Sequence, residues 1–317
     1  MRLRYISNRN KRYRLLKKWR PEITGMLLTG ETKMSVLPAQ ETLIFLEEWN
    51  RMFGTIRGQN LRALIKLAQH LQVDRFSRKM LKSRRMRDRL FAIITLGHMR
   101  EYSAWDEIAQ LLHHPHSILS LTAARALMWI NPKDAIEIII PLITTRSDWP
   151  WANVAHVLKQ APPLQLCERL SQEVLTVPVE RQAGLLRYME ASRCLQAPKF
   201  ITTILSTTND DHVLSVCLHI IADPDSLQII RQFVTHSRWH IRMHAAVALG
   251  RLGENDDIPM LLEMTADNNW WVRYRAAQAL ALIPGQNADS LMLLREQQKD
   301  GFARDILNHV IAEVQAS

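Results

Sequence analysis

Glycine is scarce in this chain, with ten among 317 residues, and long uninterrupted apolar runs are missing. Little glycine together with abundant Leu, Ile and Ala favours helices over the short, turn-rich strands of a sandwich. The longest apolar stretches, such as residues 135–143, are interrupted by Glu137 and Pro141. They fall short of the roughly 20 residues that a membrane-spanning helix needs. The sequence therefore predicts an all-α protein without a spanning segment.

Cysteine is also rare. Cys167, Cys194 and Cys217 are odd in number, share no CxxC spacing and lie in apolar helical stretches. We predict that all three are buried free thiols. Such cysteine usage fits a reducing compartment, and no apolar run at the N-terminus is typical of a signal peptide, so we expect a cytoplasmic protein.

Signatures of catalysis are missing as well. The chain has no Gly-Lys pair of a phosphate-binding loop, no His-Glu-x-x-His and no Gly-x-Ser-x-Gly. His113, His114 and His116 share one loop, but no carboxylate or thiolate stands close to them in the sequence, so they do not predict a metal site. We expect no catalytic residue, no cofactor and no metal.

Acidic residues are few at the N-terminal end. Residues 1–100 contain 23 Lys and Arg against 7 Asp and Glu, a net charge of +16, whereas the remaining residues carry −6. The basic character of the chain, +10 in total, is therefore confined to one end.

What the chain does contain is an internal repeat. Residues 239–249 (WHIRMHAAVAL) and 270–280 (WWVRYRAAQAL) align without gaps, 31 residues apart. The same spacing reaches Arg304 toward the C-terminus, and related Ala-rich segments occur at residues 123–127 and 92–97. A fixed period of this length is typical of a solenoid, in which stacked helical hairpins share a core that none could form alone. We predict about eight hairpins that stack into a curved superhelix.

The repeated pattern Val/Ile-Arg-x-x-Ala-Ala-x-Ala-Leu resembles the HEAT repeat, in particular its short bacterial, phycobilisome-lyase-like variety. The resemblance covers residues 75–317 and implies an α-solenoid. Residues 1–74 do not show the pattern and are predicted to form a basic N-terminal segment with a helical cap that includes residues 61–68. The motif identifies a fold and says little about function, because such arrays serve many unrelated tasks.

The resemblance also implies a structural role for Arg242 and Arg273. In HEAT-like repeats an arginine at this place bonds to an acidic residue six positions earlier, which builds a ladder between loops. Asp267 stands six positions before Arg273, whereas His236 takes the equivalent place before Arg242.

Trp239, Trp270 and Trp271 occupy equivalent places in adjacent repeats, so we expect them side by side at one edge of the solenoid. Aromatic residues beside arginine are typical of binding surfaces, although packing between repeats explains them equally well. The candidate partner-binding residues are Trp239, Trp270, Trp271, Arg242 and Arg273, with a protein partner expected on the concave face.

The basic end has two pieces. Residues 9–20 place Leu15, Leu16 and Trp19 on one side of a predicted helix among cations, and residues 75–89 add eight Lys or Arg to one acid. Cations interleaved with Trp and Leu are typical of a helix at an anionic membrane surface, whereas nucleic acid needs only the charge. A solvated basic face is the third interpretation. The candidate membrane or anion surface consists of Arg12, Arg14, Lys17, Lys18, Trp19, Arg20, Arg84, Arg85 and Arg87.

The chain is also similar to bacterial HEAT-repeat proteins that accompany a membrane glycosyltransferase in polysaccharide production. This similarity lies in the basic start, residues 78–97 and residues 147–150, and it implies a membrane helix upstream of the basic stretch. The expected function is a non-catalytic scaffold, peripheral to the inner membrane, that holds such an enzyme. The alternatives are a nucleic-acid-binding HEAT protein, including a DNA glycosylase-like one that uses Asp267, Trp270 and Arg273, and a bilin lyase-like protein.

Overall fold

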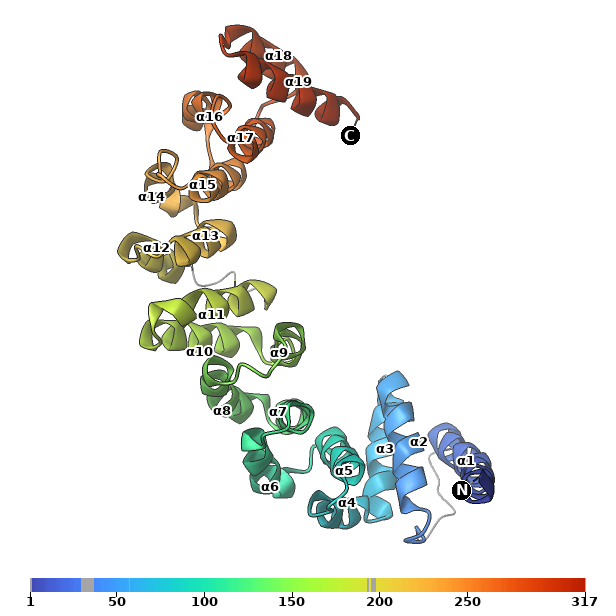
Figure 1. Cartoon of the computed structure of the whole chain (residues 1–317). Coiled ribbons are helices and arrows are strands. Elements are labelled where there is room, and N and C mark those ends of the chain that lie inside the picture. Colours follow the sequence, from blue (N-terminus) through green and yellow to red (C-terminus); the bar gives the residue numbers. More distant parts are fainter. Residues whose placement is uncertain (1, 30–36, 57, 193, 195–197, 317) are drawn as a thin grey trace. The chain divides into compact units, whose positions relative to one another are not determined.

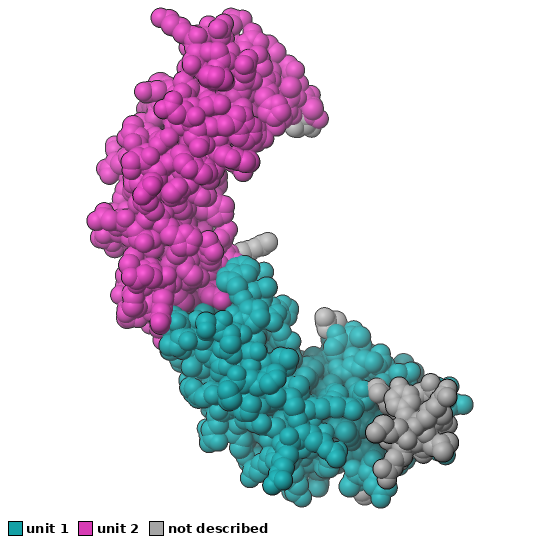
Figure 2. Space-filling view, viewed as in Figure 1, with its two compact units in different colours: residues 1–162 teal, residues 163–317 magenta. Residues whose placement is uncertain are grey.

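The computed structural model of the chain describes residues 2–29, 37–56, 58–192, 194 and 198–316, with the side chains of residues 2–12, 29, 59 and 198 excepted. Within these residues every regular element is a helix (Figure 1). The chain divides into two compact units, residues 1–162 and 163–317, which Figure 2 distinguishes by colour.

Unit 1 contains nine described α-helices and two short 3-10 helices, residues 102–104 and 111–113. The α-helices are α1 (Arg2–Thr29), α2 (Thr42–Thr55), α3 (Gln59–His70), α4 (Val73–Leu81), α5 (Met86–Met99), α6 (Trp105–Gln110), α7 (Ser117–Ile130), α8 (Pro132–Thr145) and α9 (Trp151–Leu158).

Unit 2 contains ten described α-helices and 3-10 helices at residues 224–226 and 255–257. The α-helices are α10 (Pro163–Thr176), α11 (Val179–Ala191), α12 (Pro198–Thr207), α13 (Asp211–Ile220), α14 (Leu227–Arg231), α15 (Trp239–Leu252), α16 (Ile258–Met264), α17 (Trp270–Leu282), α18 (Ala288–Gln297) and α19 (Gly301–Ala316).

From α4 onward the helices follow one another in eight successive pairs, from α4 with α5 to α18 with α19. Within unit 2, α13, α15, α17 and α19 pack successively on one another. Ala246 of α15 and Ala277 of α17 are fully buried, as the alignment of the two repeats predicts. The predicted α-solenoid is therefore confirmed, because each helix buries its apolar stripe against the next repeat.

Glycine and alanine set the distance between α15 and α17. A Cβ atom at Gly250 would lie 2.9 Å from both Cα and Cβ of Ala279, closer than side chains tolerate. Gly97 of α5 meets Ala126 of α7 in the same way, at 2.8 Å. Gly97 and Gly250 are thus placed where two helix backbones approach each other closely.

The helix breaks follow local capping rules. Asn131 ends α7 and caps α8, because its side-chain oxygen accepts hydrogen bonds from the backbone N–H groups of Lys133 and Asp134. Pro132 stands at the first position of α8, where a missing N–H costs nothing. The two residues Asn131 and Pro132 together account for the break between α7 and α8.

The N-terminal helices pack beside the first repeat, and α3 contains the helix predicted at residues 61–68. The predicted boundary after residue 74 falls inside α4, so the first hairpin begins two residues earlier than that boundary. None of the helices in the described ranges combines the length and the apolar character needed to cross a membrane.

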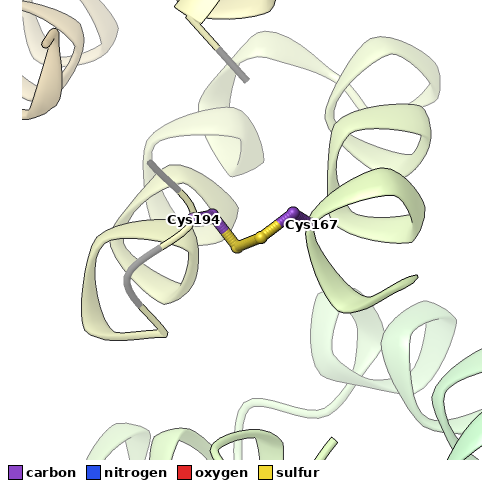
Figure 3. The surroundings of a disulfide bond; sticks show 2 residues. All are labelled: Cys167 and Cys194. Atoms are coloured by element: carbon purple, nitrogen blue, oxygen red, sulfur yellow. A yellow bond between two sulfur atoms is a disulfide. The ribbon is translucent and has the colours of Figure 1, made fainter. Parts of the chain in front are cut away.

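The prediction of three free thiols is wrong for two of them. Cys167 of α10 and Cys194, which follows α11, form a disulfide with a Cα–Cα distance of 5.3 Å (Figure 3). Cys217 of α13 is free and buried, and burial raises the pKa of its thiol to about 12. Spacing along the sequence did not indicate the bond because the antiparallel helices α10 and α11 bring residues 27 positions apart together. Since disulfides are typical of oxidising compartments, the cysteines no longer support a cytoplasmic location.

Candidate partner-binding site

Four large aromatic side chains stand exposed at the first two positions of α15, α17 and α19. The exposed fractions are 41% for Trp239, 45% for Trp270, 49% for Trp271 and 67% for Phe302. Trp239 and Trp270 are equivalent in adjacent repeats, as are Trp271 and Phe302. Because the three helices stack on one another, these rings form a series along the repeats, which we call the aromatic edge. The sequence indicated the three tryptophans but missed Phe302, although the period of the repeat points to it.

Contacts within α17 hold part of the aromatic edge in place. The ring of Trp270 stacks on Tyr274, with centroids 5.1 Å apart, and meets Trp271 edge-on at 4.8 Å. The Tyr274 hydroxyl donates a hydrogen bond to Glu313 of α19 at 3.0 Å. Trp270 is therefore supported on one side by packing between repeats while nearly half of its surface stays exposed.

Arg242 lies within the arginine ladder that the sequence predicts. Its Nε and Nη2 donate hydrogen bonds to the two carboxylate oxygens of Asp267, at 2.7 and 2.9 Å. Its Nη1 donates to the backbone carbonyls of His236 and Ser237, six and five positions earlier. With only 17% of its side chain exposed, Arg242 joins two repeats through Asp267.

The predicted pairing of Arg273 with the carboxylate six positions earlier is wrong. Arg273 Nη1 donates instead to the backbone carbonyls of Asp267 and Asn268, at 2.9 and 3.3 Å, as Arg242 does one repeat earlier. The carboxylate of Asp267 belongs to Arg242 of the preceding repeat. Burial opposes ionisation of Asp267, but the hydrogen bonds from Arg242 and from the Asn269 N–H outweigh it, so the pKa of Asp267 is lowered.

The same hydrogen bond recurs just before five helices, α5, α7, α13, α15 and α17. In each case a side chain accepts a hydrogen bond, at 2.8 to 3.2 Å, from the backbone N–H two residues later, which belongs to the N-cap residue of the helix. The acceptors are Ser83, His114, Thr208, His236 and Asp267. Histidine therefore replaces aspartate at this place without changing the turn, which explains why His236 precedes Arg242.

These repeated contacts agree with the comparison of the chain with known families. A family model described as HEAT repeats matches residues 76–159 and 199–281, which together make up just over half of the chain. The chain belongs to the HEAT-repeat family. The bacterial, phycobilisome-lyase-like subtype stays a prediction.

Two solved structures similar to this HEAT-repeat chain are crystal structures of engineered proteins. The first is 15% identical, covers 92% of this chain and 88% of that chain, and has a TM-score of 0.36. The second is 14% identical, covers 86% of this chain and 96% of that chain, and has a TM-score of 0.23. Both TM-scores are too low to support an argument. No curated protein matches the chain.

In unit 1 of the HEAT-repeat protein, two acids of α2 and its N-cap residue Glu41 neutralise part of the predicted basic surface. Lys18 and Arg20 of α1 pair with Glu41 and Glu48, each at 2.8 Å, and Arg87 of α5 pairs with Glu47 at 3.5 Å. Both α1 and α5 therefore pack against α2, and part of their positive charge stabilises the fold.

The remaining cations of the predicted surface are exposed. Lys17 of α1 and Arg84 and Arg85, just before α5, have no ion pair among the described residues. Arg14 is also exposed, and the side chain of Arg12 lies outside the described residues.

The placement of Trp19 at a membrane surface is wrong. Its side chain is 1% exposed and meets Phe45 of α2 edge-on, with ring centroids 5.2 Å apart. Leu15 and Leu16 are half-buried on the same helix. The apolar side of α1 thus packs against its neighbours, which removes the feature that favoured a membrane over nucleic acid.

The loop histidines do not gather around a common point. The Nδ1 of His114 accepts a hydrogen bond from the backbone N–H of His116, and its Nε2 lies 3.4 Å from Nη1 of Arg89. Across the part of the chain that the structure describes, no three side chains of the metal-ligating types converge.

Proposed function

We propose that this HEAT-repeat protein is a non-catalytic scaffold that binds a protein partner at the aromatic edge of unit 2. The observation that carries the proposal is the exposure of Trp239, Trp270 and Trp271, each between 41% and 49%, on stacked helices. Monomeric proteins rarely leave contiguous apolar surface exposed without a use for it. Tryptophan and arginine are also the side chains that contribute most to protein interfaces.

Charge supports a protein partner over a nucleic acid at this edge. Residues 163–317 carry 14 Lys and Arg against 18 Asp and Glu, a net charge of −4. A negatively charged unit repels a polyphosphate backbone, from which nucleic-acid binding draws much of its affinity. A base-excision role for Asp267 is also disfavoured, because its carboxylate is bound by Arg242 and only 12% exposed.

A polysaccharide glycosyltransferase remains one candidate partner, and its only support is the resemblance in the sequence. The cytoplasmic location and the membrane-surface position are not part of the proposal. The disulfide removes the support for the first, and the burial of Trp19 removes the support for the second.

Site-specific photo-crosslinking in the producing cells tests the proposal. Benzoylphenylalanine in place of Trp271 should give a discrete adduct with one protein, and excess wild-type chain should compete it away. Excess Trp270→Ala/Trp271→Ala chain should not compete. The matched control is Leu164 of α10, an apolar side chain of the same unit that is 66% exposed. Equal adducts at residues 164 and 271, or none at 271, would contradict the proposal.

A further inference from the structure

The arginine ladder lacks its last acidic partner at the C-terminal end of unit 2. Arg242 binds the carboxylate of Asp267, which stands 25 residues later. The residue in the same register after Arg273 is Gln298, and its amide nitrogen donates to the Leu262 carbonyl at 3.2 Å instead. Within the described residues, no acceptor is bound to Nε or Nη2 of Arg273, the two nitrogens that correspond to those holding Asp267.

The register itself recurs in unit 1, which makes it a property of the repeat. Arg89 occupies the same helix position in α5 as Arg242 does in α15, and its guanidinium faces His114, again 25 residues later. In both units the side chain at this distance faces the ladder arginine. Arg273 is the ladder arginine whose corresponding side chain turns elsewhere.

One aromatic ring lies over the guanidinium of Arg273, and two more stand on the preceding turn of α17. The guanidinium carbon lies 5.0 Å from the centroid of the Phe302 ring, which is 67% exposed. Trp270 and Trp271 stand three and two positions before Arg273 on α17, both nearly half exposed. A guanidinium held by an aromatic ring on one side and backbone carbonyls on another is preoriented, so little rotamer freedom is lost when its free edge binds.

We propose that the Nε–Nη2 edge of Arg273 binds the carboxylate of an aspartate or glutamate in the partner, in the way that Arg242 binds Asp267. The apolar residues that flank this acid in the partner pack on Trp270, Trp271 and Phe302. This inference rests on the proposed function, since it names the chemistry of the segment that the aromatic edge binds. Charge complementarity and the planar, bidentate hydrogen-bonding geometry of the guanidinium group favour a carboxylate over a neutral amide.

A substitution within the chain tests whether the open edge accepts a carboxylate at all. Gln298→Asp places the missing acid at the ladder position, and the Arg273 Nε–H resonance should shift as a hydrogen bond forms. The melting temperature should rise by about 4 °C, because the new pair adds roughly the contribution of one charged hydrogen bond. Gln298→Asn, which has the same shape without the charge, is the control. An Nε–H resonance that is the same in Gln298→Asp and Gln298→Asn would overturn the proposal.

The binding test uses an array of short peptides with one central Glu between apolar residues, each paired with its Gln counterpart. The full chain should bind Glu peptides about tenfold more tightly than their Gln partners, because a carboxylate makes the stronger hydrogen bonds with guanidinium. Arg273→Gln should lose this preference while keeping weaker binding through the tryptophans. Gln298→Asp should lose it as well, because the open edge is then filled from within.

The other outcomes of the peptide array contradict either the carboxylate site at Arg273 alone or the proposed function as well. If the chain binds Glu and Gln peptides equally, and Trp270→Ala/Trp271→Ala abolishes both, the carboxylate site is wrong while the proposed function stands. Preference for Glu that persists in both Arg273→Gln and Gln298→Asp places the acid elsewhere and overturns the inference. Binding of neither peptide class contradicts the proposed function together with the inference.

Discussion

Two histidines of unit 1, His98 and His113, lie in different surroundings, and these surroundings decide how each affects the pH dependence of stability. His98 of α5 is half-buried between the rings of Phe53 and Trp129, at centroid distances of 4.1 and 4.4 Å. Its Nδ1 lies 3.0 Å from the side-chain oxygen of Asn50. Burial lowers the pKa of His98 from 6.5 to about 4, because a charged imidazole in this aromatic site would lose its hydration. His113, in contrast, is exposed in its loop.

This burial makes unit 1 sensitive to acid. Between pH 6.5 and 4 the unfolded chain binds a proton at residue 98 and the folded chain does not, so stability falls as the pH falls through this window. The loss attributable to His98 should reach up to about 3 kcal/mol. Hydrogen exchange of α5 and α7 at several pH values measures it. His98→Gln should flatten the pH dependence, and His113→Gln should not. Equal pH dependence in all three proteins would refute this assignment.

At the scale of helices, the close packing of α15 on α17 depends on two of the smallest residues, Gly250 and Ala279. Gly250 faces Ala279 across the contact, and the two helix backbones lie so close that there is no room for a side chain at residue 250. The repeat therefore stabilises itself through close backbone packing as well as through large apolar residues. Gly184 of α11 provides a natural comparison, because nothing lies within 4 Å of a Cβ placed there.

The two glycines should respond in opposite directions to the same change. Gly250→Ala should lower the free energy of unfolding by about 1 to 3 kcal/mol, because the added methyl group overpacks the contact with Ala279. Gly184→Ala should raise it by roughly 0.5 to 1 kcal/mol, because alanine restricts the unfolded chain and fits an open helix position. Urea titration of both variants measures the difference. Stabilisation by both substitutions would show that α15 and α17 are not in close contact.

At the scale of the whole molecule, the two units differ in charge and in covalent constraint. Residues 1–162 carry a net charge of +14 and residues 163–317 a net charge of −4. The Cys167–Cys194 disulfide lies within unit 2, where it joins α10 to the chain after α11. Oxidation therefore stabilises one unit and leaves the other without a corresponding bond.

Reduction should accordingly destabilise only unit 2. Closing a loop of this size restricts the unfolded chain, and its loss should cost unit 2 about 3 kcal/mol. Hydrogen exchange with and without reductant should show faster exchange in α10 to α13 and unchanged exchange in α5 and α7. The Cys167→Ser/Cys194→Ser variant should behave like the reduced protein even without reductant, whereas Cys217→Ser should still respond to it. Non-reducing peptide mapping that finds Cys167 and Cys194 unlinked would contradict the bond.

The sequence by itself determined the helical repeat, its 31-residue period and the burial of Ala246 and Ala277. These features follow from spacing along one helix and from one repeat to the next, which the chain records directly. Only the tertiary structure decided which tryptophan is a core residue and which is exposed. The side chain of Trp19 packs against Phe45 of α2 and is 1% exposed, whereas Trp271, at the start of α17, is 49% exposed.

The partners of specific side chains were likewise beyond the sequence. Arg242 reaches an acid in the following repeat, and Cys167 reaches a cysteine 27 residues away, across distances that depend on how helices pack. Local spacing can predict which residues share the face of a helix. It cannot predict which face another helix will cover, because that choice is made by the packing of many residues at once.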